Sequence, residues 1–288
     1  MSVADIPPIE HAAGIEIVGD LAELRSKAGI SVYRAQSRAG SVIIKLFEHA
    51  ADRREIANYQ LLTHLGIPTI HVLGCGESFI VLEDLEASQE FRLGREEDLG
   101  DVQIARSLAE WYLALHDKGA RAPGLGSLYA ETDLITAEAL ASLGRRFPQT
   151  GTTVAFLLEH LTLLRAKIDA LAQTLTYNDF YWDNLAVRRD RSAALMFDYN
   201  LLGRGYRYGD IRNVCSSLSP EAGEAFVQTY CATHGDLDPH ERALDRLLAD
   251  LVTLIVASQR PSWPSWATSA LHAAENGNLL QEAEQNLG

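Results

Sequence analysis

Positive charge is scarce in this sequence. The 288 residues include 25 Lys and Arg against 39 Asp and Glu, which gives a formal net charge of −14 at pH 7. A general nucleic-acid binder needs a basic surface that displaces counterions from phosphates, so this class of function is disfavoured. An acidic surface favours solubility, and it would also suit a cationic ligand.

Cysteines and long apolar runs are scarce as well. Cys75, Cys215 and Cys231 form no close pair, which indicates reduced thiols in a cytosol and argues against a zinc knuckle. The apolar runs, such as LVTLIVA at 251–257, are far too short to span a bilayer. The first residues lack the basic start and the apolar run of a secretion signal. We therefore expect a cytoplasmic protein with no membrane anchor.

Several catalytic motifs are absent. The sequence has no G-x-x-x-x-G-K-[ST] phosphate loop, no G-x-S-x-G nucleophile elbow and no H-E-x-x-H zinc helix. The short glycine patterns at 74–76 and 124–127 lack a third glycine, and we interpret them as turns. Nothing in the sequence therefore points to those three kinds of site.

The first hundred residues are predicted to be mostly strands. Short runs rich in apolar and β-branched residues at 20–25, 31–36 and 41–47 are separated by turn residues, which is typical of a three-strand meander. A helix is predicted at 52–66, where apolar residues recur at helical spacing before a glycine. Two more strand-like runs follow between residues 70 and 85.

The chain becomes mainly helical after Asp101, which is a plausible helix N-cap. The strand-like interruption is a predicted hairpin at 184–198. The fold class is therefore α+β, with a bilobal architecture. Lobe 1–85 would be small and β-rich, with a five-stranded antiparallel sheet plus one helix, and lobe 86–288 would be larger and mostly helical. Helical spacing recurs in five further segments, at 133–146, 153–174, 219–234, 240–258 and 265–274.

Five polar residues stand in an order that suits phosphate transfer. They are a lysine in the third predicted strand, a glutamate that begins the next helix, an Asp-x-x-x-x-Asn pair and an aspartate that ends the hairpin: Lys45, Glu55, Asp179, Asn184 and Asp198. Each alone has an ordinary structural explanation, such as an edge-strand lysine or a turn-forming aspartate. Together they match what transfer from a nucleotide needs: a lysine on the phosphates held by a carboxylate, a base for the acceptor hydroxyl, and hard oxygen ligands for Mg²⁺.

The predicted hairpin would bring two of these residues together. Asn184 enters its first strand and Asp198 leaves its second, so antiparallel pairing places both side chains where they can face one metal ion. The spacing from Asp179 to Asn184 equals that of the protein-kinase loop H-R-D-x-x-x-x-N. Lys45 lies in the third strand of the small lobe, as in protein kinases. A protein-kinase-like fold is therefore predicted.

These segments resemble the aminoglycoside phosphotransferase and choline kinase-like family of small-molecule kinases. YNDFYWDNLAV at 177–187 is similar to the family's H-G-D-x-x-x-x-N loop, and LMFDYN at 195–200 is similar to its metal-binding aspartate segment. GYRYGDIRNV at 205–214 resembles the stretch that follows. REIANYQLLTHLGIPTIHVLG at 54–74 is similar to the family's first-lobe helix and the turn after it. The resemblance covers residues 20–260.

The resemblance implies a role for each of the five polar residues. Asp179 would be the catalytic base. Asn184 and Asp198 would bind Mg²⁺. Lys45 would hold the α- and β-phosphates of ATP or GTP, and Glu55 would pair with it.

The resemblance also implies contacts to the rest of the nucleotide. The segment FIVLEDLE would connect the lobes, and there the backbone groups of Glu83 and Leu85 would face the base. The loop that would cover the phosphates, SKAGIS, has a single glycine, so Ser26 and Ser31 are the expected phosphate contacts.

The loop 177–184 departs from the family pattern. The family's usual histidine is Tyr177 here, so the loop has to be supported differently. We expect Tyr177 and Phe180 to pack inward, and Tyr181 or Trp182 to face the acceptor.

The first functional hypothesis is an ATP- or GTP-dependent kinase of a small hydroxyl-bearing molecule. The acidic balance favours a cationic acceptor, such as an aminoglycoside-type antibiotic or an amino alcohol. Glu131, Asp133 and Glu138 are candidate acceptor contacts, although a solvated helix face explains these three acids equally well. No nucleic acid, membrane or obligate protein partner is expected.

Two alternatives remain open from the sequence. Tyr177 and the glycine-poor loop also suit a catalytically weak, nucleotide-binding regulator with a kinase-like fold. A protein kinase is the weaker alternative, because the D-F-G and A-P-E motifs and the room for a long activation loop are missing.

Overall fold

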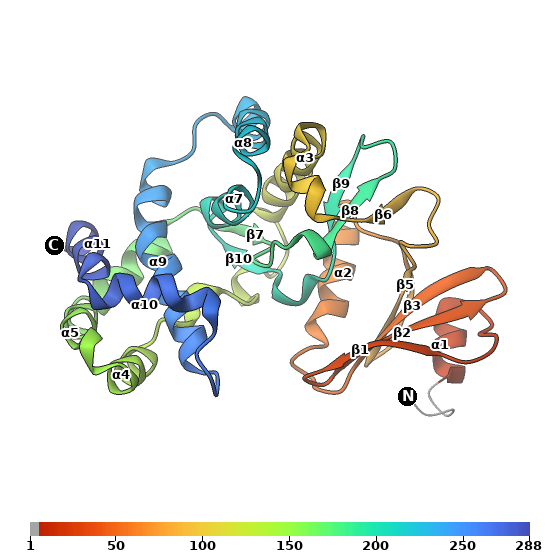
Figure 1. The fold of residues 1–288 in the computed structure, drawn as a ribbon, viewed down its shortest axis with the longest axis horizontal. Coiled ribbons are helices and arrows are strands. Elements are labelled where there is room, and N and C mark those ends of the chain that lie inside the picture. The colour runs from red at the N-terminus through yellow and green to blue at the C-terminus, as the bar shows by residue number, and fades with distance from the viewer. Residues whose placement is uncertain (1–5) are drawn as a thin grey trace. The chain divides into compact units, whose positions relative to one another are not determined.

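The computed structural model describes residues 6–288, apart from the side chain of His234, and Figure 1 shows its helices and strands. The chain divides into two units. The first unit comprises residues 6–122, 177–202 and 213–233, and the second comprises residues 123–176, 203–212 and 234–288. Neither unit is one continuous segment. The lobe boundary predicted at residue 85 falls inside the first unit and stays a prediction.

A five-stranded antiparallel sheet begins the first unit. Its strands are β1 (Ala22–Lys27), β2 (Ile30–Ser37), β3 (Gly40–Phe47), β4 (Val72–Cys75) and β5 (Phe79–Glu83), arranged in the order β1-β2-β3-β5-β4. The meander predicted from the sequence is present as β1, β2 and β3. The turn between β1 and β2 has only two residues, Ala28 and Gly29, and both have positive φ, 53° and 80°. Such turns match the right-handed twist of the strands that they join.

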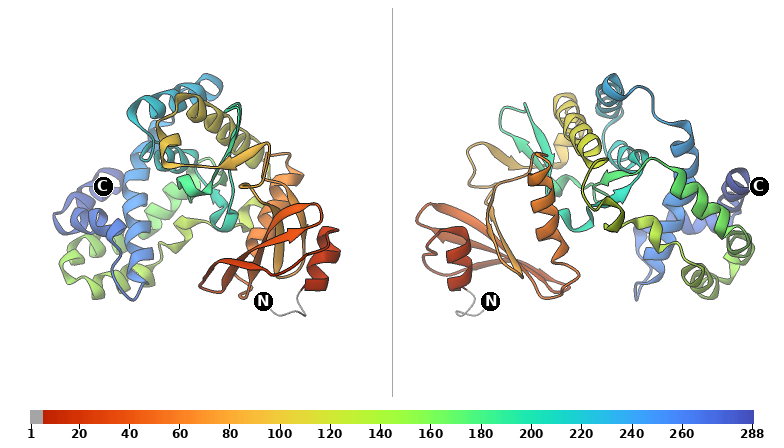
Figure 2. Two further views of the ribbon diagram at one scale, coloured as in Figure 1. Left: turned by 45° about the vertical axis from the view of Figure 1, so that its right-hand side comes forward. Right: turned by 180° about the vertical axis from the view of Figure 1, so that it is seen from behind.

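Two helices pack on opposite faces of this sheet (Figure 2). Helix α1 (Ile6–Ala13), which the sequence did not lead us to expect, buries Ile9 against one face, in a cluster with Ile44 of β3. Lys45 follows Ile44 and points to the other face, because successive strand residues alternate. There it meets helix α2 (Arg54–His64). The helix predicted at 52–66 is therefore confirmed, with slightly shorter bounds.

The rest of the first unit surrounds the predicted hairpin. Strands β8 (Leu185–Arg188) and β9 (Ala194–Met196) form it, and β6 (Phe91–Leu93) adds a third strand that was not predicted. The Asp101 carboxylate accepts hydrogen bonds from the first backbone amides of helix α3, which confirms it as the N-cap. The unit also contains η2 (Glu96–Gly100), α3 (Val102–Gly119), η6 (Trp182–Asn184), η7 (Tyr199–Leu201) and α8 (Pro220–His234).

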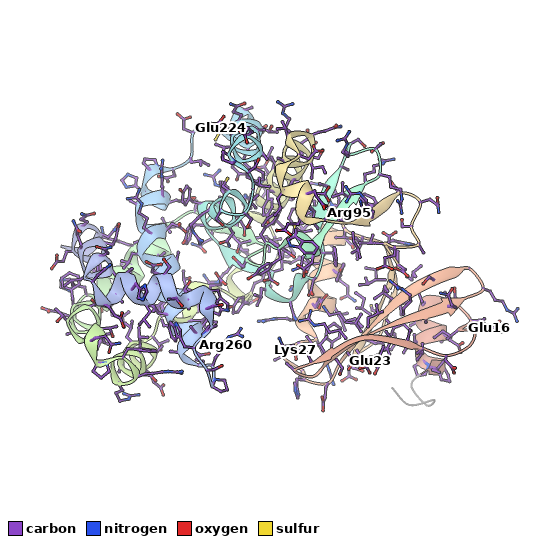
Figure 3. All side chains as sticks on the ribbon, in the orientation of Figure 1. Glu16, Glu23, Lys27, Arg95, Glu224 and Arg260 are labelled. Carbon is purple, nitrogen blue, oxygen red and sulfur yellow. The ribbon has the colours of Figure 1, made fainter. Side chains whose placement is uncertain are left out.

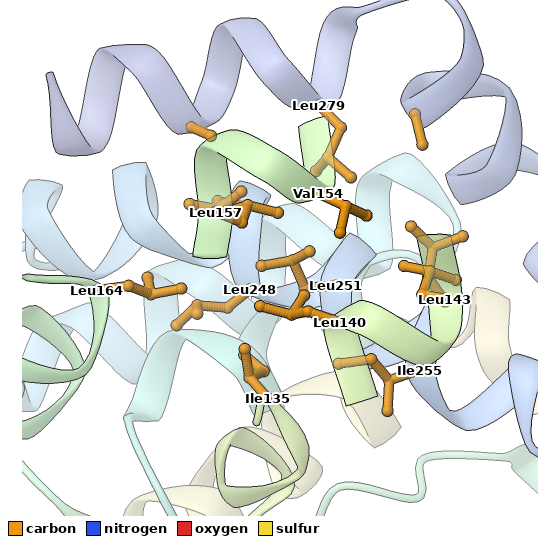
Figure 4. Packing of buried hydrophobic residues seen from close by; sticks show 14 of the residues in the cluster. Ile135, Leu140, Leu143, Val154, Leu157, Leu164, Leu248, Leu251, Ile255 and Leu279 are labelled. Carbon is orange, nitrogen blue, oxygen red and sulfur yellow. The ribbon is translucent and has the colours of Figure 1, made fainter. Parts of the chain in front are cut away.

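The second unit is mostly helical around one hydrophobic core. Leu140, Leu157, Leu248 and Leu251 are buried at its centre (Figure 4). Its helices are α4 (Ala137–Arg146), α5 (Gly151–Glu159), α6 (Leu161–Ala170), α9 (Pro239–Ser258), α10 (Thr268–Glu275) and α11 (Asn278–Leu287). Its short elements are η3 (Leu125–Ser127), η4 (Glu131–Leu134), η5 (Pro148–Thr150), η8 (Ser265–Ala267) and the paired strands β7 (Thr174–Thr176) and β10 (Gly203–Gly205). Helix α7 (Arg207–Cys215) runs from the second unit into the first.

Two details of the helical region bear on the sequence predictions. The single helix expected at 153–174 is wrong, because the chain leaves helical geometry at His160 and forms α5 and α6 instead. The sequence has no proline or glycine at this break, and its apolar residues keep helical spacing across it, so the pattern predicted one helix. Within residues 6–288, no helix is both long enough and apolar enough to cross a membrane.

Gly74 of β4 allows α1 to approach the sheet closely. A Cβ atom at Gly74 would lie 2.3 Å from the Ala12 carbonyl oxygen of α1. We expect Gly74→Ala to lower the free energy of unfolding by about 2 kcal/mol, because the helix has to move off the sheet. Urea denaturation measures this change. Gly223→Ala in α8, where nothing lies within 4 Å of the added methyl group, is the matched control and should not destabilise. Equal stability of both variants would contradict the packing described here.

Candidate active site

A buried lysine on β3 forms two ion pairs in the first unit. The Lys45 Nζ lies 2.5 Å from Glu55 Oε2 of α2 and 2.9 Å from Asp198 Oδ1. Lys45 is 7% exposed and Glu55 is 1% exposed. Burial by itself would lower the pKa of Lys45, but the charges of Glu55 and Asp198 outweigh it and the pKa is raised. Lys45 therefore stays a cation. Three of the residues that the sequence analysis grouped, Lys45, Glu55 and Asp198, are in direct contact.

The β8–β9 hairpin brings Asn184 and Asp198 to the same place. The backbone amide of Phe197 donates to the Asn184 carbonyl at 3.0 Å, so the residue before Asp198 is paired with Asn184. This is the arrangement that the sequence predicted from antiparallel pairing. Asp198 has a φ of 63°, a left-handed conformation that aspartate tolerates better than most residues.

Asp179 lies half-buried in the loop 177–184. Burial raises the pKa of its carboxyl to about 6, and the nearby charges of Asp198 and Asp183 act in the same direction. The Asn184 amide group lies 3.3 Å from the Asp179 carbonyl oxygen and 3.4 Å from Oδ2. A carboxylate with a raised pKa can accept a proton near neutral pH, which is what a general base does.

The donor set beside Asp179 suits a hard cation. Asp198 contributes carboxylate oxygens and Asn184 a carboxamide oxygen, the ligand types that Mg²⁺ takes. The two residues are held together by the hairpin, and Asp198 already binds the ammonium group of Lys45. The residues present therefore fit a Mg²⁺ site in their chemistry.

Side chains bind the backbone carbonyls that surround Asp198. The buried Asn58 of α2 donates to the Tyr199 carbonyl at 2.8 Å, and Asn178 donates to the Leu201 carbonyl at 3.0 Å. The Tyr177 hydroxyl donates to the Phe197 carbonyl. Sequence reasoning missed Asn58, although it lies one helical turn after Glu55 and therefore faces the same side of α2.

The inward packing predicted for two aromatic residues of the loop 177–184 is confirmed. Tyr177 is fully buried and Phe180 is 7% exposed, so both pack inward, and Tyr177 packs edge-on against Trp111 and Tyr199. Tyr181 and Trp182 remain exposed, at 58% and 40%. Two aromatic faces thus lie on the surface between Asp179 and Asn184.

The structure does not place the hydroxyls of Ser26 and Ser31 with Lys45. They face one another across β1 and β2, 2.9 Å apart. Ser31 pairs with Leu46, whereas its neighbour Val32 pairs with Lys45, so the two serines point to the opposite face of the sheet. Any phosphate contact from these positions would have to come from the backbone.

The segment after β5 is fixed by a buried carboxylate that the sequence analysis overlooked. Asp84 is 4% exposed and accepts hydrogen bonds from Arg34 at 2.7 Å and from Ser41 at 2.6 Å. The predicted base-binding residues, Glu83 and Leu85, stand on either side of it. The Glu83 amide donates to the His71 carbonyl at 3.0 Å, and Leu85 is buried.

The three acids proposed for acceptor binding lie in the second unit. Glu131 and Asp133 are in η4, and Glu138 is exposed in the first turn of α4. Asp133 is already paired, with its two carboxylate oxygens 2.8 and 3.1 Å from the guanidinium of Arg204. An external cation would therefore have to compete with Arg204 for Asp133.

The hydroxyl of Tyr177 gives a test of how residues 197–201, the Asp198 segment, are held in place. We expect Tyr177→Phe to lower the free energy of unfolding by about 1 kcal/mol, because it leaves the Phe197 carbonyl without this donor. Thermal or urea unfolding measures the loss. Tyr181→Phe, at an exposed ring of the same loop, is the control and should change nothing. A Tyr177→Phe variant as stable as the control would show that this hydrogen bond contributes little.

Comparisons with known proteins identify one family for this chain. The model of a family described as the phosphotransferase enzyme family matches residues 20–247. No sequence among curated proteins matches the chain.

Solved structures share the fold at low sequence identity. A macrolide 2'-phosphotransferase from Brachybacterium faecium is 18% identical, with a TM-score of 0.61 over 93% of this chain and 97% of that chain. A choline/ethanolamine kinase family protein from Mesorhizobium loti is 15% identical, with a TM-score of 0.66 over 99% and 97%. A spectinomycin phosphotransferase solved with AMP is 14% identical, with a TM-score of 0.63 over 97% and 96%.

At such identities these structures are similar in fold, and they confirm the predicted kinase-like fold. The family model carries the assignment further, because it covers more than half of the chain. The expectation that the protein is an enzyme of the small-molecule kinase class is confirmed with it. The protein belongs to the phosphotransferase enzyme family.

Proposed function

We propose that this enzyme transfers the terminal phosphate of a nucleoside triphosphate to a hydroxyl group of a small cationic molecule. The observation that supports this most directly is the ion-paired trio of Lys45, Glu55 and Asp198, with Asp179 and Asn184 on the adjoining loop. Phosphate transfer depends on positioning and on neutralising charge, and these residues supply a fixed cation, a base and metal ligands.

The nucleotide would be ATP or GTP, held by Lys45 at its α- and β-phosphates. Glu55 keeps the Lys45 ammonium group on the face of the sheet that α2 covers. There the ammonium group can exchange Asp198 for a phosphate oxygen. The backbone of Glu83 and Leu85 would face the base, and the bonds to Asp84 fix that segment. A related spectinomycin phosphotransferase was solved with AMP, which supports a nucleotide in this fold.

Asn184 and Asp198 would hold Mg²⁺, and the ion, when bound, would neutralise charge on the phosphates. Asp179 would accept the proton of the acceptor hydroxyl. Its raised pKa, about 6, still leaves it mostly ionised at neutral pH, while it makes the carboxylate a stronger base than an ordinary aspartate.

The acceptor would be a hydroxyl compound that carries a positive charge. Asp179, Asp183 and Asp198 raise the negative charge around the loop, and Tyr181 and Trp182 offer exposed rings next to the base. Aromatic faces attract cations, particularly ammonium groups. Glu131, Asp133 and Glu138 of the second unit stay candidates that the sequence predicts for the acceptor amine. The related structures include proteins named for macrolide, spectinomycin and choline or ethanolamine, so the family accommodates several such compounds.

The experiment that tests this function is a phosphate-transfer screen with ATP, GTP and Mg²⁺. Acceptors should include aminoglycosides, macrolides, choline, ethanolamine, homoserine and neutral sugars. We expect transfer to at least one amine-bearing alcohol, and we expect Asp179→Asn to abolish it while the variant still folds and binds nucleotide. Near-wild-type turnover in Asp179→Asn would remove this residue as the base. Nucleotide binding without transfer to any acceptor would favour the regulator instead.

The raised pKa of Asp179 predicts how activity depends on pH. As the pH falls through about 6, Asp179 takes up a proton and can no longer accept one. We therefore expect kcat/KM to fall below pH 6, with a slope that approaches tenfold per pH unit at the acid end. A profile that stays flat down to pH 5 would contradict this.

The same shift has the opposite effect on stability. A pKa raised by folding contributes stability that is fully present below the unfolded value of 3.8 and is lost as the pH rises through about 6. Asp179→Asn should therefore unfold at a higher temperature than the wild type at pH 8, and the difference should vanish near pH 3.5. Thermal scans at the two pH values check the sign.

A further inference from the structure

Two cations of β1 share the sheet face of Lys45. Arg25 pairs with Val32 of β2, and Val32 pairs with Lys45. Lys27 pairs with Ile30, which lies on the same side of β2 as Val32 because the two are two residues apart. Directly paired residues on antiparallel strands point to one face, so Arg25 and Lys27 point to the face of Lys45.

A bulge in β1 sets which residues face this way. The register between β1 and β2 shifts between Glu23 and Arg25, where Leu24 is the extra residue. Without the bulge, each side chain from Arg25 to Lys27 would turn to the other face. Arg25 and Lys27 thus point to the face of Lys45, and Ser26, which lies between them in the sequence, points to the other face.

Lys27 is the cation of this pair that stands next to the hairpin turn (Figure 3). Its side chain is exposed, and within residues 6–288 it forms no ion pair. Two other cations on this face are already occupied: Lys45 pairs with Glu55 and Asp198, and Arg34 pairs with Asp84. Arg25 is exposed like Lys27, but it lies in the row of Lys45, where the α- and β-phosphates would lie. The ammonium group of Lys27 is therefore available to an external anion.

The sheet register places Lys27 beyond Lys45 on the path of a bound nucleotide. Glu83, next to which the base would lie, pairs with Val42 at one end of β3. Lys45 is three residues further along β3, and Phe47, which pairs with Ile30 in the row of Lys27, is two residues further still. Two residues of strand correspond to about 7 Å. With the α- and β-phosphates at Lys45, the terminal phosphate lies toward the row of Lys27.

The hairpin turn is too short to wrap a phosphate by backbone alone. Only Ala28 and Gly29 separate the strands, whereas glycine-rich phosphate loops surround the anion with several consecutive amides. A Cβ atom at Gly29 would lie 2.5 Å from the His49 ring, so a larger residue at this position of the turn would clash with His49. The positive charge of a lysine at the end of β1 can bind a phosphate where the short turn offers too few backbone amides.

We propose that Lys27 binds the terminal phosphate of the nucleoside triphosphate, an inference that rests on the proposed function. It makes the enzyme prefer a triphosphate over a diphosphate, since only the triphosphate reaches the row of Lys27. The residue acts on nucleotide binding and takes no part in proton transfer.

The test is calorimetric titration of ATP, ADP and AMP, with Mg²⁺ present, into the full chain and its variants. We expect Lys27→Gln to weaken ATP binding about tenfold and to leave ADP and AMP nearly unchanged. Lys27→Arg should retain the preference for ATP. Arg38→Gln is the control: it removes an exposed positive charge, paired with Glu16, in the turn between β2 and β3, and it should not alter the preference. The effect of Lys27→Gln should shrink as salt is added.

The outcomes separate this inference from the proposed function. If the wild type binds ATP and Lys27→Gln binds it equally well, the role of Lys27 is overturned and the proposed function stands. Equal weakening of ATP, ADP and AMP would also overturn the assignment to the terminal phosphate. If the wild type binds no nucleotide, the proposed function fails and the inference fails with it. Thermal unfolding of each variant shows whether a loss of binding comes from a loss of fold.

Discussion

The buried ion pair between Lys45 and Glu55 is the interaction on which the candidate site depends. Both groups are almost excluded from water, and each charge is tolerable there only because the other is present. The pair therefore fixes α2 against β3. Asp198 adds a second carboxylate to one lysine, and the trio is net negative whenever Glu55 is ionised. Burial, together with the charge of Asp198, raises the pKa of Glu55 to about 7. That negative charge is unfavourable in the protein alone, and a bound divalent cation would relieve it.

The shape of the Asp198 segment is maintained by side chains more than by regular secondary structure. Asp198 has an uncommon backbone conformation, and the residues after it form only a short 3₁₀ turn. Asn58, Asn178 and Tyr177 come from two separate parts of the sequence and each binds a carbonyl of this segment. Because Asn58 and Glu55 share one helix, α2 holds Asp198 in two ways: through its backbone neighbour Tyr199 and through Lys45.

The sequence predicted the parts of this structure that local signals determine. Strand alternation and turn residues identified β1, β2 and β3, and the spacing of Asn184 and Asp198 within a hairpin predicted that they would meet. Strand β6 escaped notice because it has three residues and pairs with β8 far along the chain. The facing of Ser26 and Ser31 could not be foreseen either, because one bulge near Leu24 reverses every side chain that follows. Asn58 and Asp84 could not be predicted because each binds residues that are distant in the sequence: Asn58 binds the carbonyl of Tyr199, and Asp84 binds Arg34 and Ser41.

The phenol of Tyr177 gives the loop 177–184 a support that does not titrate. A histidine at this position would change its charge between pH 5 and 8. Burial raises the pKa of Tyr177 well above its ordinary value of 10, so the hydroxyl stays a neutral donor to the Phe197 carbonyl across the physiological range. The support of the loop by Tyr177 therefore does not change over the pH range in which Asp179 titrates. Acid can protonate Asp179 without loosening the loop that carries it, so this enzyme should lose and regain its proton acceptor with its geometry intact.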